Sequence, residues 1–140
     1  MLSRMAGSCS AVAHCPLSNS YFSEKPFPLR EALNLGVPIG LGTDIAGGYS
    51  IDIMNSMRQA VAVSRIRDGT RKLSDNSGQS LAVDWKDALF LATKGGANAL
   101  GLPSGVFQAG APFDAQYSEW NIYRKKWCLN KWCCSPSVQR

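Results

Sequence analysis

The most constraining stretch of this sequence is an uncharged run that ends at an aspartate. Residues 37–42 carry no charged side chain, and Asp44 follows two positions later. Such a run is typical of a strand that is buried on both faces of a parallel sheet. Asp44 therefore lies at the carboxyl end of a predicted strand, where parallel α/β proteins bind their ligands. An aspartate after a strand is also a common turn former or helix N-cap, so position alone leaves these roles open.

A second short strand is predicted at residues 11–14, and it ends at His14, the only histidine. Residues 15–19 are predicted to form a loop. Leucines at helical spacing predict a short helix over residues 29–35. Strand, helix and strand in this order predict a crossover unit with parallel strands. The carboxyl end of the first strand would then lie beside that of the strand that precedes Asp44.

Downstream of this unit, the pattern predicts two helices, a further helical turn and a short strand or hairpin. Apolar residues at spacings of three and four define the helices, and glycines are expected to end them. The expected elements are a helix capped by Ser50 or Asp52 and stopped by Gly69, a polar loop over 70–79, a helix from Asp84 to Lys94 stopped by Gly95 and Gly96, a turn at 97–100, and a strand or hairpin over 105–115.

The positive charge of the chain is concentrated at its end. The net charge is +5, and residues 117–140 hold five Lys and Arg residues against one Glu, together with three of the five cysteines. These cysteines have no spacing typical of a zinc site, so reduced thiols are expected. The sequence also lacks a run of about 18 apolar residues and a signal-peptide pattern. We therefore expect a cytoplasmic protein with neither nucleic acid nor a membrane as partner.

Three stretches together resemble one known family. They are residues 13–19 (Ala-His-Cys-Pro-Leu-Ser-Asn), residues 40–50 (Gly-Leu-Gly-Thr-Asp-Ile-Ala-Gly-Gly-Tyr-Ser) and residues 90–102. Their order and spacing resemble the C-terminal part of the guanine deaminases, within the amidohydrolase superfamily. Many amidohydrolases share the Gly-Thr-Asp strand end, whereas the Gly-Gly-Tyr-Ser continuation is closer to guanine deaminases. The resemblance covers roughly residues 5–116.

The resemblance implies an α/β fold that is the C-terminal part of a (β/α)8 barrel. Residues 1–104 would contribute its last two strands and flanking helices, and residues 105–116 a strand that returns to a small β-sandwich. Residues 117–140 would be an atypical basic tail rich in Trp and Cys. Because such a barrel takes about 250 residues, we expect an incomplete piece that is inactive alone.

The resemblance further implies a zinc-dependent hydrolase that converts guanine to xanthine and ammonia. Asp44 would be a zinc ligand and the catalytic group that exchanges a proton with the attacking water. His14 and Asn19 would lie at the substrate or support the groups around the ion, and Ser18 would help to shape the same loop. Guanine is the implied substrate and one zinc ion the implied cofactor, with the remaining ligands outside this chain and a homodimer as the implied assembly.

Two alternatives from other classes stay open. One is a small α/β module without catalysis, in which backbone N–H groups after Gly47 and Gly48 hold an anion or a nucleic acid at a helix N-terminus. The chain lacks the Gly-x-x-x-x-Gly-Lys and Gly-x-Gly-x-x-Gly signatures at this turn. The other alternative is binding of RNA or a membrane through the basic segment 117–140.

Overall fold

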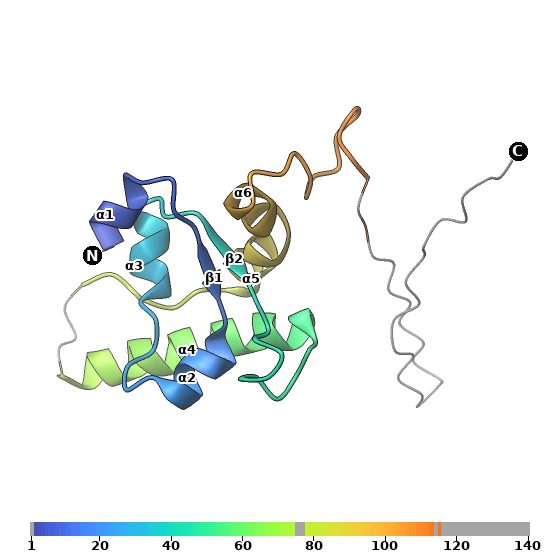
Figure 1. Ribbon diagram of the computed structural model, residues 1–140. Helices are drawn as coiled ribbons and strands as arrows, with labels where there is room; N and C mark the ends of the chain where they lie inside the picture. Colours follow the sequence, from blue (N-terminus) through green and yellow to red (C-terminus); the bar gives the residue numbers. More distant parts are fainter. Residues whose placement is uncertain (1, 75–77, 114, 116–140) are drawn as a thin grey trace, which may run out of the picture.

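The fold is an α/β arrangement with two strands at its centre (Figure 1). The computed structural model describes residues 2–74, 78–113 and 115. In chain order, the elements are α1 (Leu2–Ala6), β1 (Val12–His14), α2 (Pro16–Phe22), α3 (Leu29–Asn34), β2 (Ile39–Leu41), α4 (Ile53–Ser74), α5 (Trp85–Phe90), the π-helical turn η1 (Leu91–Gly95) and α6 (Gly96–Ala99).

The two strands pair in parallel, with Val12 opposite Ile39 and His14 opposite Leu41. Since α3 connects them, the predicted crossover unit is confirmed. The strands end level with each other, and the backbone N–H of Gly42 donates to the carbonyl oxygen of His14 at 2.9 Å. Both following segments therefore leave the sheet at one edge.

The segment after β1 is a helix and not the predicted loop. α2 begins at Pro16, where proline is favoured because the first helical N–H has no partner within the helix. Ser20 Oγ also donates to the carbonyl oxygen of Pro16 at 2.8 Å. Proline, serine and asparagine are common in loops and equally in first helical turns, and this ambiguity made the loop prediction over 15–19 wrong.

The core fills the space between the sheet and the helices. It consists of Leu29, Ala32, Val37, Ile39, Ala60, Val83 and Leu91. In Figure 1, α4 runs along one side of the molecule, and it contacts α2, β2 and α5. The sequence did not predict α1, which packs Leu2 and Met5 against this core. Each large apolar side chain buried there contributes about 1.5–3 kcal/mol.

Two arginine–carboxylate ion pairs link α3 to α4 and α5. Arg30 Nη2 lies 2.5 Å from Asp87 Oδ2 at the start of α5. Arg67 of α4 donates to both carboxylate oxygens of Glu31, and this bonding holds the pKa of Glu31 below its usual value. Bidentate Arg–carboxylate pairs fix geometry as well as charge. The crossover helix is thus oriented by polar contacts in addition to its apolar face.

The predicted cap at Asp52 is confirmed, and Asp84 caps the helix that was predicted to begin there. Asp52 Oδ1 accepts a hydrogen bond from the N–H of Met54 at 2.9 Å, at the start of α4. Asp84 Oδ1 accepts from the N–H of Lys86 at 2.8 Å, and Asp87 Oδ2 accepts from the N–H of Asp84 at 2.9 Å. The second pair is a capping box, in which each acidic side chain satisfies a backbone donor of the helix end.

α4 passes through the glycine that was predicted to stop it. The helix continues beyond Gly69 to Ser74, so the predicted loop over 70–79 begins later than expected. Asp68 Oδ2 lies 2.7 Å from Lys72 Nζ, and Asp68 Oδ1 accepts from the N–H of Leu81 at 2.9 Å. A helical glycine costs about 1 kcal/mol, which these contacts help to offset. None of the helices in the described ranges has both the length and the apolar character to cross a membrane.

The helix after Asp84 also continues past the glycines expected to end it. Its backbone runs on through η1 into α6, so the predicted further turn at 97–100 is a continuation. A Cβ on Gly40 would lie 2.8 Å from Gly96 Cα, and one on Gly95 would lie 2.8 Å from the carbonyl oxygen of Ile39. The glycines at this contact let the helix backbone touch β2. They serve packing rather than termination.

The strand or hairpin expected over 105–115 is wrong for the described part of that range. Residues 105–113 form turns and bends. A strand needs a neighbour to satisfy its backbone groups, and in the described chain the only sheet is the β1–β2 pair. The assignment of 105–116 to a β-sandwich stays a prediction, and the predicted tail at 117–140 lies outside the described residues.

Two glycine substitutions test this account of helix continuation. Gly69→Ala places its methyl group in open space, so we expect the free energy of unfolding to rise by about 0.5–1 kcal/mol. Gly40→Ala forces its Cβ against Gly96 Cα, so we expect a fall of about 1–3 kcal/mol. Urea unfolding of the chain measures both. Destabilisation by Gly69→Ala would contradict a helix that runs through this position.

Candidate active site

The carboxyl ends of the two strands bring Ser18 and Asp44 together. Ser18 Oγ donates to Asp44 Oδ2 at 2.5 Å, although the residues are 26 positions apart in the sequence. The contact exists because parallel strands end at one edge and α2 turns back over that edge. The predicted meeting of the two strand ends is confirmed, and it is made through Ser18.

Asp44 has an uncommon backbone conformation. Its φ is 51°, the only positive φ of a residue other than glycine in the described ranges. The N–H of Gly48 donates to the Asp44 carbonyl oxygen at 2.7 Å and closes a turn. Left-handed backbone at such a residue costs of order 1 kcal/mol or more and is enriched at functional sites. Asp44 does form a turn, but the cap of α4 is Asp52, so that role for Asp44 is excluded.

The Asp44 carboxylate is held on one side and open on the other. Its side chain is exposed. Oδ2 accepts the hydrogen bond of Ser18, whereas no hydrogen bond from within the described chain reaches Oδ1. The open oxygen lies at the end of β2, where a ligand or ion would bind in a parallel α/β fold.

Gly47 and Gly48 permit the close turning that the sequence predicted. A Cβ on Gly47 would overlap Asp44 Oδ2 and lie 3.3 Å from Phe22 Cε2. The Gly48 N–H is already bonded to Asp44, and α4 begins only at Ile53. The alternative of an anion site at this turn is therefore disfavoured, because the donor is occupied and a carboxylate lies beside it.

His14, which is buried, and Asn19, which is half-buried, form a pair next to this edge. His14 is 3% exposed, and its Nδ1 lies 3.1 Å from Asn19 Oδ1. Its ring centroid is 5.1 Å from that of Phe27. Burial lowers the pKa of His14 to about 4, although the Asn19 bond raises it in part. The neutral ring then carries its hydrogen on Nδ1 and donates it to Asn19. The structure brings these two predicted residues together but does not bring His14 to Asp44.

Cys15 was not expected at the site, and Ser18 was expected only to shape the loop there. A Cβ on Gly42 would lie 2.8 Å from Cys15 Sγ, which shows how tightly the thiol sits at the strand ends. Burial, together with the negative charge of Asp44, raises the pKa of Cys15. The available signal was Pro16: a helix beginning there turns Ser18 toward the strand ends.

The described residues offer one position of a metal site and do not complete one. Within 2–74, 78–113 and 115, no three His, Cys, Asp or Glu side chains are grouped so that they could hold an ion. Asp44 fits a single ligand position through its open oxygen, since carboxylate oxygen is an ordinary zinc ligand. The remaining ligands of such a site would have to come from other residues.

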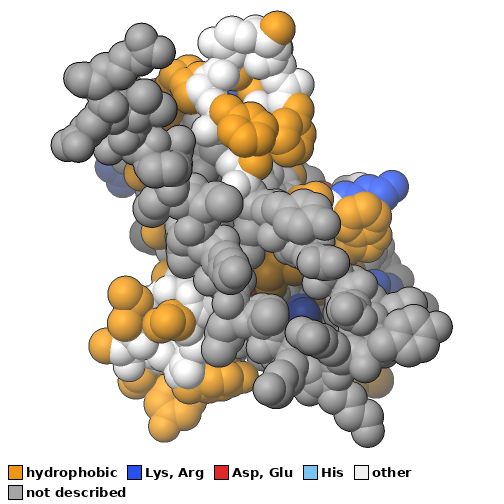
Figure 2. All heavy atoms as spheres, turned by 90° about the vertical axis from the view of Figure 1, so that its right-hand side faces the viewer, with side chains coloured by type: hydrophobic (Ala, Val, Ile, Leu, Met, Phe, Trp, Pro, Cys, Tyr) orange, Lys and Arg blue, Asp and Glu red, His pale blue; other side chains and the backbone are white. Residues whose placement is uncertain are grey.

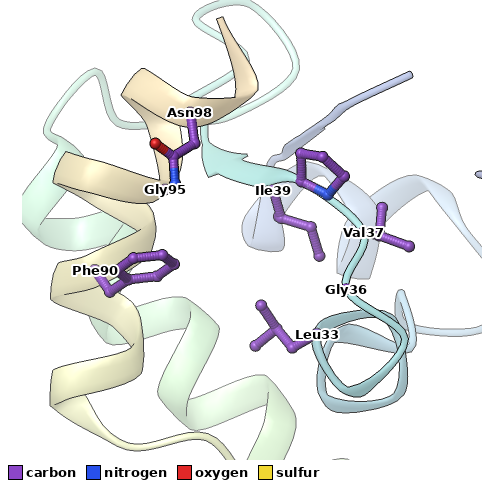
Figure 3. Close-up of a pocket in the computed structure, with 8 residues that line it drawn as sticks. Leu33, Gly36, Val37, Ile39, Phe90, Gly95 and Asn98 are labelled. Carbon is purple, nitrogen blue, oxygen red and sulfur yellow. The ribbon is translucent and has the colours of Figure 1, made fainter. Parts of the chain in front are cut away.

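An apolar pocket lies at the opposite end of β2. Its volume is about 300 Å³, and it is lined by Leu33, Gly36, Val37, Pro38, Ile39, Phe90, Gly95 and Asn98. Figure 3 shows Phe90 and Leu33 on two sides of this space, with Asn98 reaching in from the helix beside the strand. Because it is lined by the residues that lead into β2, this pocket is separate from the edge that carries Asp44.

Large hydrophobic side chains are exposed close to Ser18 and Asp44 in the sequence. Tyr21, Phe22, Ile45, Tyr49 and Ile51 are each more than two-thirds exposed. Figure 2 shows hydrophobic side chains gathered in separate groups at the top and bottom of one face of the molecule.

The chain is similar to deaminases of known families. The Amidohydrolase family model matches residues 2–122. The guanine deaminase of Mus musculus is 42% identical over 108 residues, which are 76% of this chain and 22% of that protein. The 5-methylthioadenosine/S-adenosylhomocysteine deaminase of Pyrococcus furiosus is 38% identical over 109 residues, which are 76% of this chain and 24% of that protein.

Two solved guanine deaminases share the fold of this chain. The enzyme from E. coli superposes with a TM-score of 0.59 at 30% identity, over 72% of this chain and 21% of its own. The enzyme from C. acetobutylicum was solved with guanine bound in its active site. It superposes with a TM-score of 0.68 at 25% identity, over 79% of this chain and 25% of its own. The chain thus spans 20–24% of the curated relatives that it matches.

The buried His14 predicts a pH dependence of stability. As the pH falls below 6.5, the imidazole takes up a proton in the unfolded chain, whereas the folded one stays neutral down to about pH 4. The free energy of unfolding therefore has its full His14 contribution above pH 6.5, and it falls by about 3 kcal/mol as the pH drops toward 4. Urea unfolding at several pH values should show that the free energy of unfolding falls more between pH 6.5 and 4 in the parent chain than in His14→Gln, by about this amount. Equal slopes would contradict a neutral buried histidine.

Proposed function

This chain belongs to the amidohydrolase family, and on that premise we propose that it carries the last two strand ends of a guanine deaminase active site. The observation that carries the proposal is the Asp44 carboxylate, held by Ser18 at the shared strand edge with one oxygen open. The similarity to guanine deaminases from several organisms supports this choice of substrate.

The proposed reaction is the hydrolysis of guanine to xanthine and ammonia. Water supplies the oxygen that forms the new bond at C2, and the C2–N bond to the amino group breaks. Zinc, when bound, would supply a Lewis acid that lowers the pKa of the attacking water. Asp44 would be one ligand, would accept a proton from this water, and would return it to the departing amine.

His14 and Asn19 are proposed to support this arrangement from behind. The ring of His14 packs beside Phe27 and bonds to Asn19. Asn19 follows Ser18 directly on α2, so this part-buried hydrogen bond helps to fix the helix that presents the serine hydroxyl. A supporting role therefore suits His14 better than direct contact with guanine.

β1 and β2 are proposed as the seventh and eighth strands of a (β/α)8 barrel, within residues 1–104. The exposed hydrophobic side chains that lie close to Asp44 in the sequence support this assignment, because adjoining parts of a barrel would cover them. We propose that the 140-residue chain is inactive alone, since a catalytic zinc takes about three protein ligands and the described residues offer one. The cytoplasmic location and the homodimer stay predictions.

A chimera tests the proposed function. Residues 2–113 of this chain replace the matching segment of the Mus musculus guanine deaminase, and xanthine and ammonia are measured after addition of guanine. We expect turnover by the chimera, and a fall in kcat of about 10²–10⁴-fold in Asp44→Asn. Asp52→Asn is the matched control, because asparagine caps a helix as well as aspartate does.

Two outcomes would contradict the proposal. Retention of full activity by the Asp44→Asn chimera would remove Asp44 from catalysis. Sustained release of ammonia from guanine and zinc by the 140-residue chain alone would show that it does not depend on ligands from outside.

A further inference from the structure

We propose that Ser18 is a positioning residue that fixes Oδ2 of Asp44 and so makes Oδ1 the oxygen presented at the strand ends. The role of Oδ1 toward a metal or a proton rests on the proposed function, whereas the fixing of Oδ2 does not. The Ser18–Asp44 distance of 2.5 Å lies in the short range of hydroxyl–carboxylate hydrogen bonds. Ser18 is 8% exposed, so water has little access to compete for its hydroxyl.

The space around Oδ2 gives a second, independent reason. A Cβ on Gly47 would overlap Oδ2, which means that the glycine backbone lies directly against this oxygen. The oxygen is therefore enclosed between the Ser18 hydroxyl and the Gly47 backbone. Rotation of the carboxylate that exchanged its two oxygens would have to pass this enclosure and break the Ser18 bond.

Both partners of the hydrogen bond are held by their own surroundings. The Asp44 backbone is fixed by the turn that Gly48 closes. On the other side, the part-buried bond between the buried His14 and Asn19 anchors the helix that carries Ser18. The hydroxyl and the carboxylate are thus brought together by two separately restrained segments, as a preorganised group requires.

The consequence is a carboxylate whose Oδ2 is fixed by the chain and whose Oδ1 is left to bind an ion or a proton. An unrestrained carboxylate would have to be ordered each time it bound an ion or took a proton, and a small misplacement of a reacting group lowers rates strongly. Fixing Oδ2 from within the chain removes this requirement. The effect is expected in kcat, because the Ser18 hydroxyl is engaged with Asp44 and would act on the reaction through that carboxylate.

Hydrogen exchange on the 140-residue chain tests the fixing of Oδ2 without any activity. The reporter is the Gly48 amide, which donates to the Asp44 carbonyl oxygen and is protected while that turn is closed. We expect Ser18→Ala to lower its protection about tenfold, the size of one charge-assisted hydrogen bond. Ser18→Thr keeps the hydroxyl and should restore protection.

Ser20→Ala is the matched control for this measurement. Ser20 lies on the same helix, and its hydroxyl bonds only locally, to the carbonyl oxygen of Pro16. Gly48 protection should therefore equal that of the parent chain. The proposal is overturned if Ser18→Ala leaves the protection unchanged, or if Ser20→Ala lowers it as much.

The chimera tests the presentation of Oδ1. Ser18→Ala should lower kcat at least tenfold with KM within about threefold, and should lower the zinc content retained on dialysis, while Ser18→Thr recovers both. Unchanged kcat and zinc content in Ser18→Ala would overturn this part. If the parent chimera is itself inactive, the proposed function fails, and the exchange comparison alone decides whether Ser18 fixes Asp44.

Discussion

The parallel pairing of β1 with β2 is the constraint on which the rest of this structure depends. Because His14 lies opposite Leu41, the two strands end level with each other. The segments that follow must therefore share one edge, and this places Ser18 within hydrogen-bond distance of Asp44. A shift of the pairing by one residue would turn every strand side chain to the other face and separate the two ends.

The elements that can be predicted from the sequence are those whose signals are local. The crossover unit, the cap at Asp52 and the start of a helix at Asp84 follow from short patterns that the structure retains. The helix ends were wrong at Gly69 and Gly95 because tertiary contacts decide there. At the first glycine, bonds to Asp68 carry the helix onward, and at the second the glycine lets the backbone touch β2. Propensity gives way to packing in both places.

The candidate site shows the same division. The position of Asp44 at a strand end followed from an uncharged run, and the family resemblance supplied a role for it. The bond to Ser18 did not follow, because it joins residues 26 positions apart and depends on α2, where the sequence predicts a loop over residues 15–19. The two roles expected for His14, at the substrate or in support of the groups around the ion, stay predictions, and its ring is buried beside Phe27. Strand position predicts where a side chain starts, and packing decides where it points.

The left-handed backbone at Asp44 limits which amino acids this position tolerates. Glycine, asparagine and aspartate enter that region at the least cost, and β-branched residues at the greatest. A glutamate would keep the negative charge, yet it would be penalised by the backbone and would carry its carboxylate one methylene too far from Ser18. Saturation mutagenesis at this position would therefore return few well-folded variants, whatever chemistry the library was selected for.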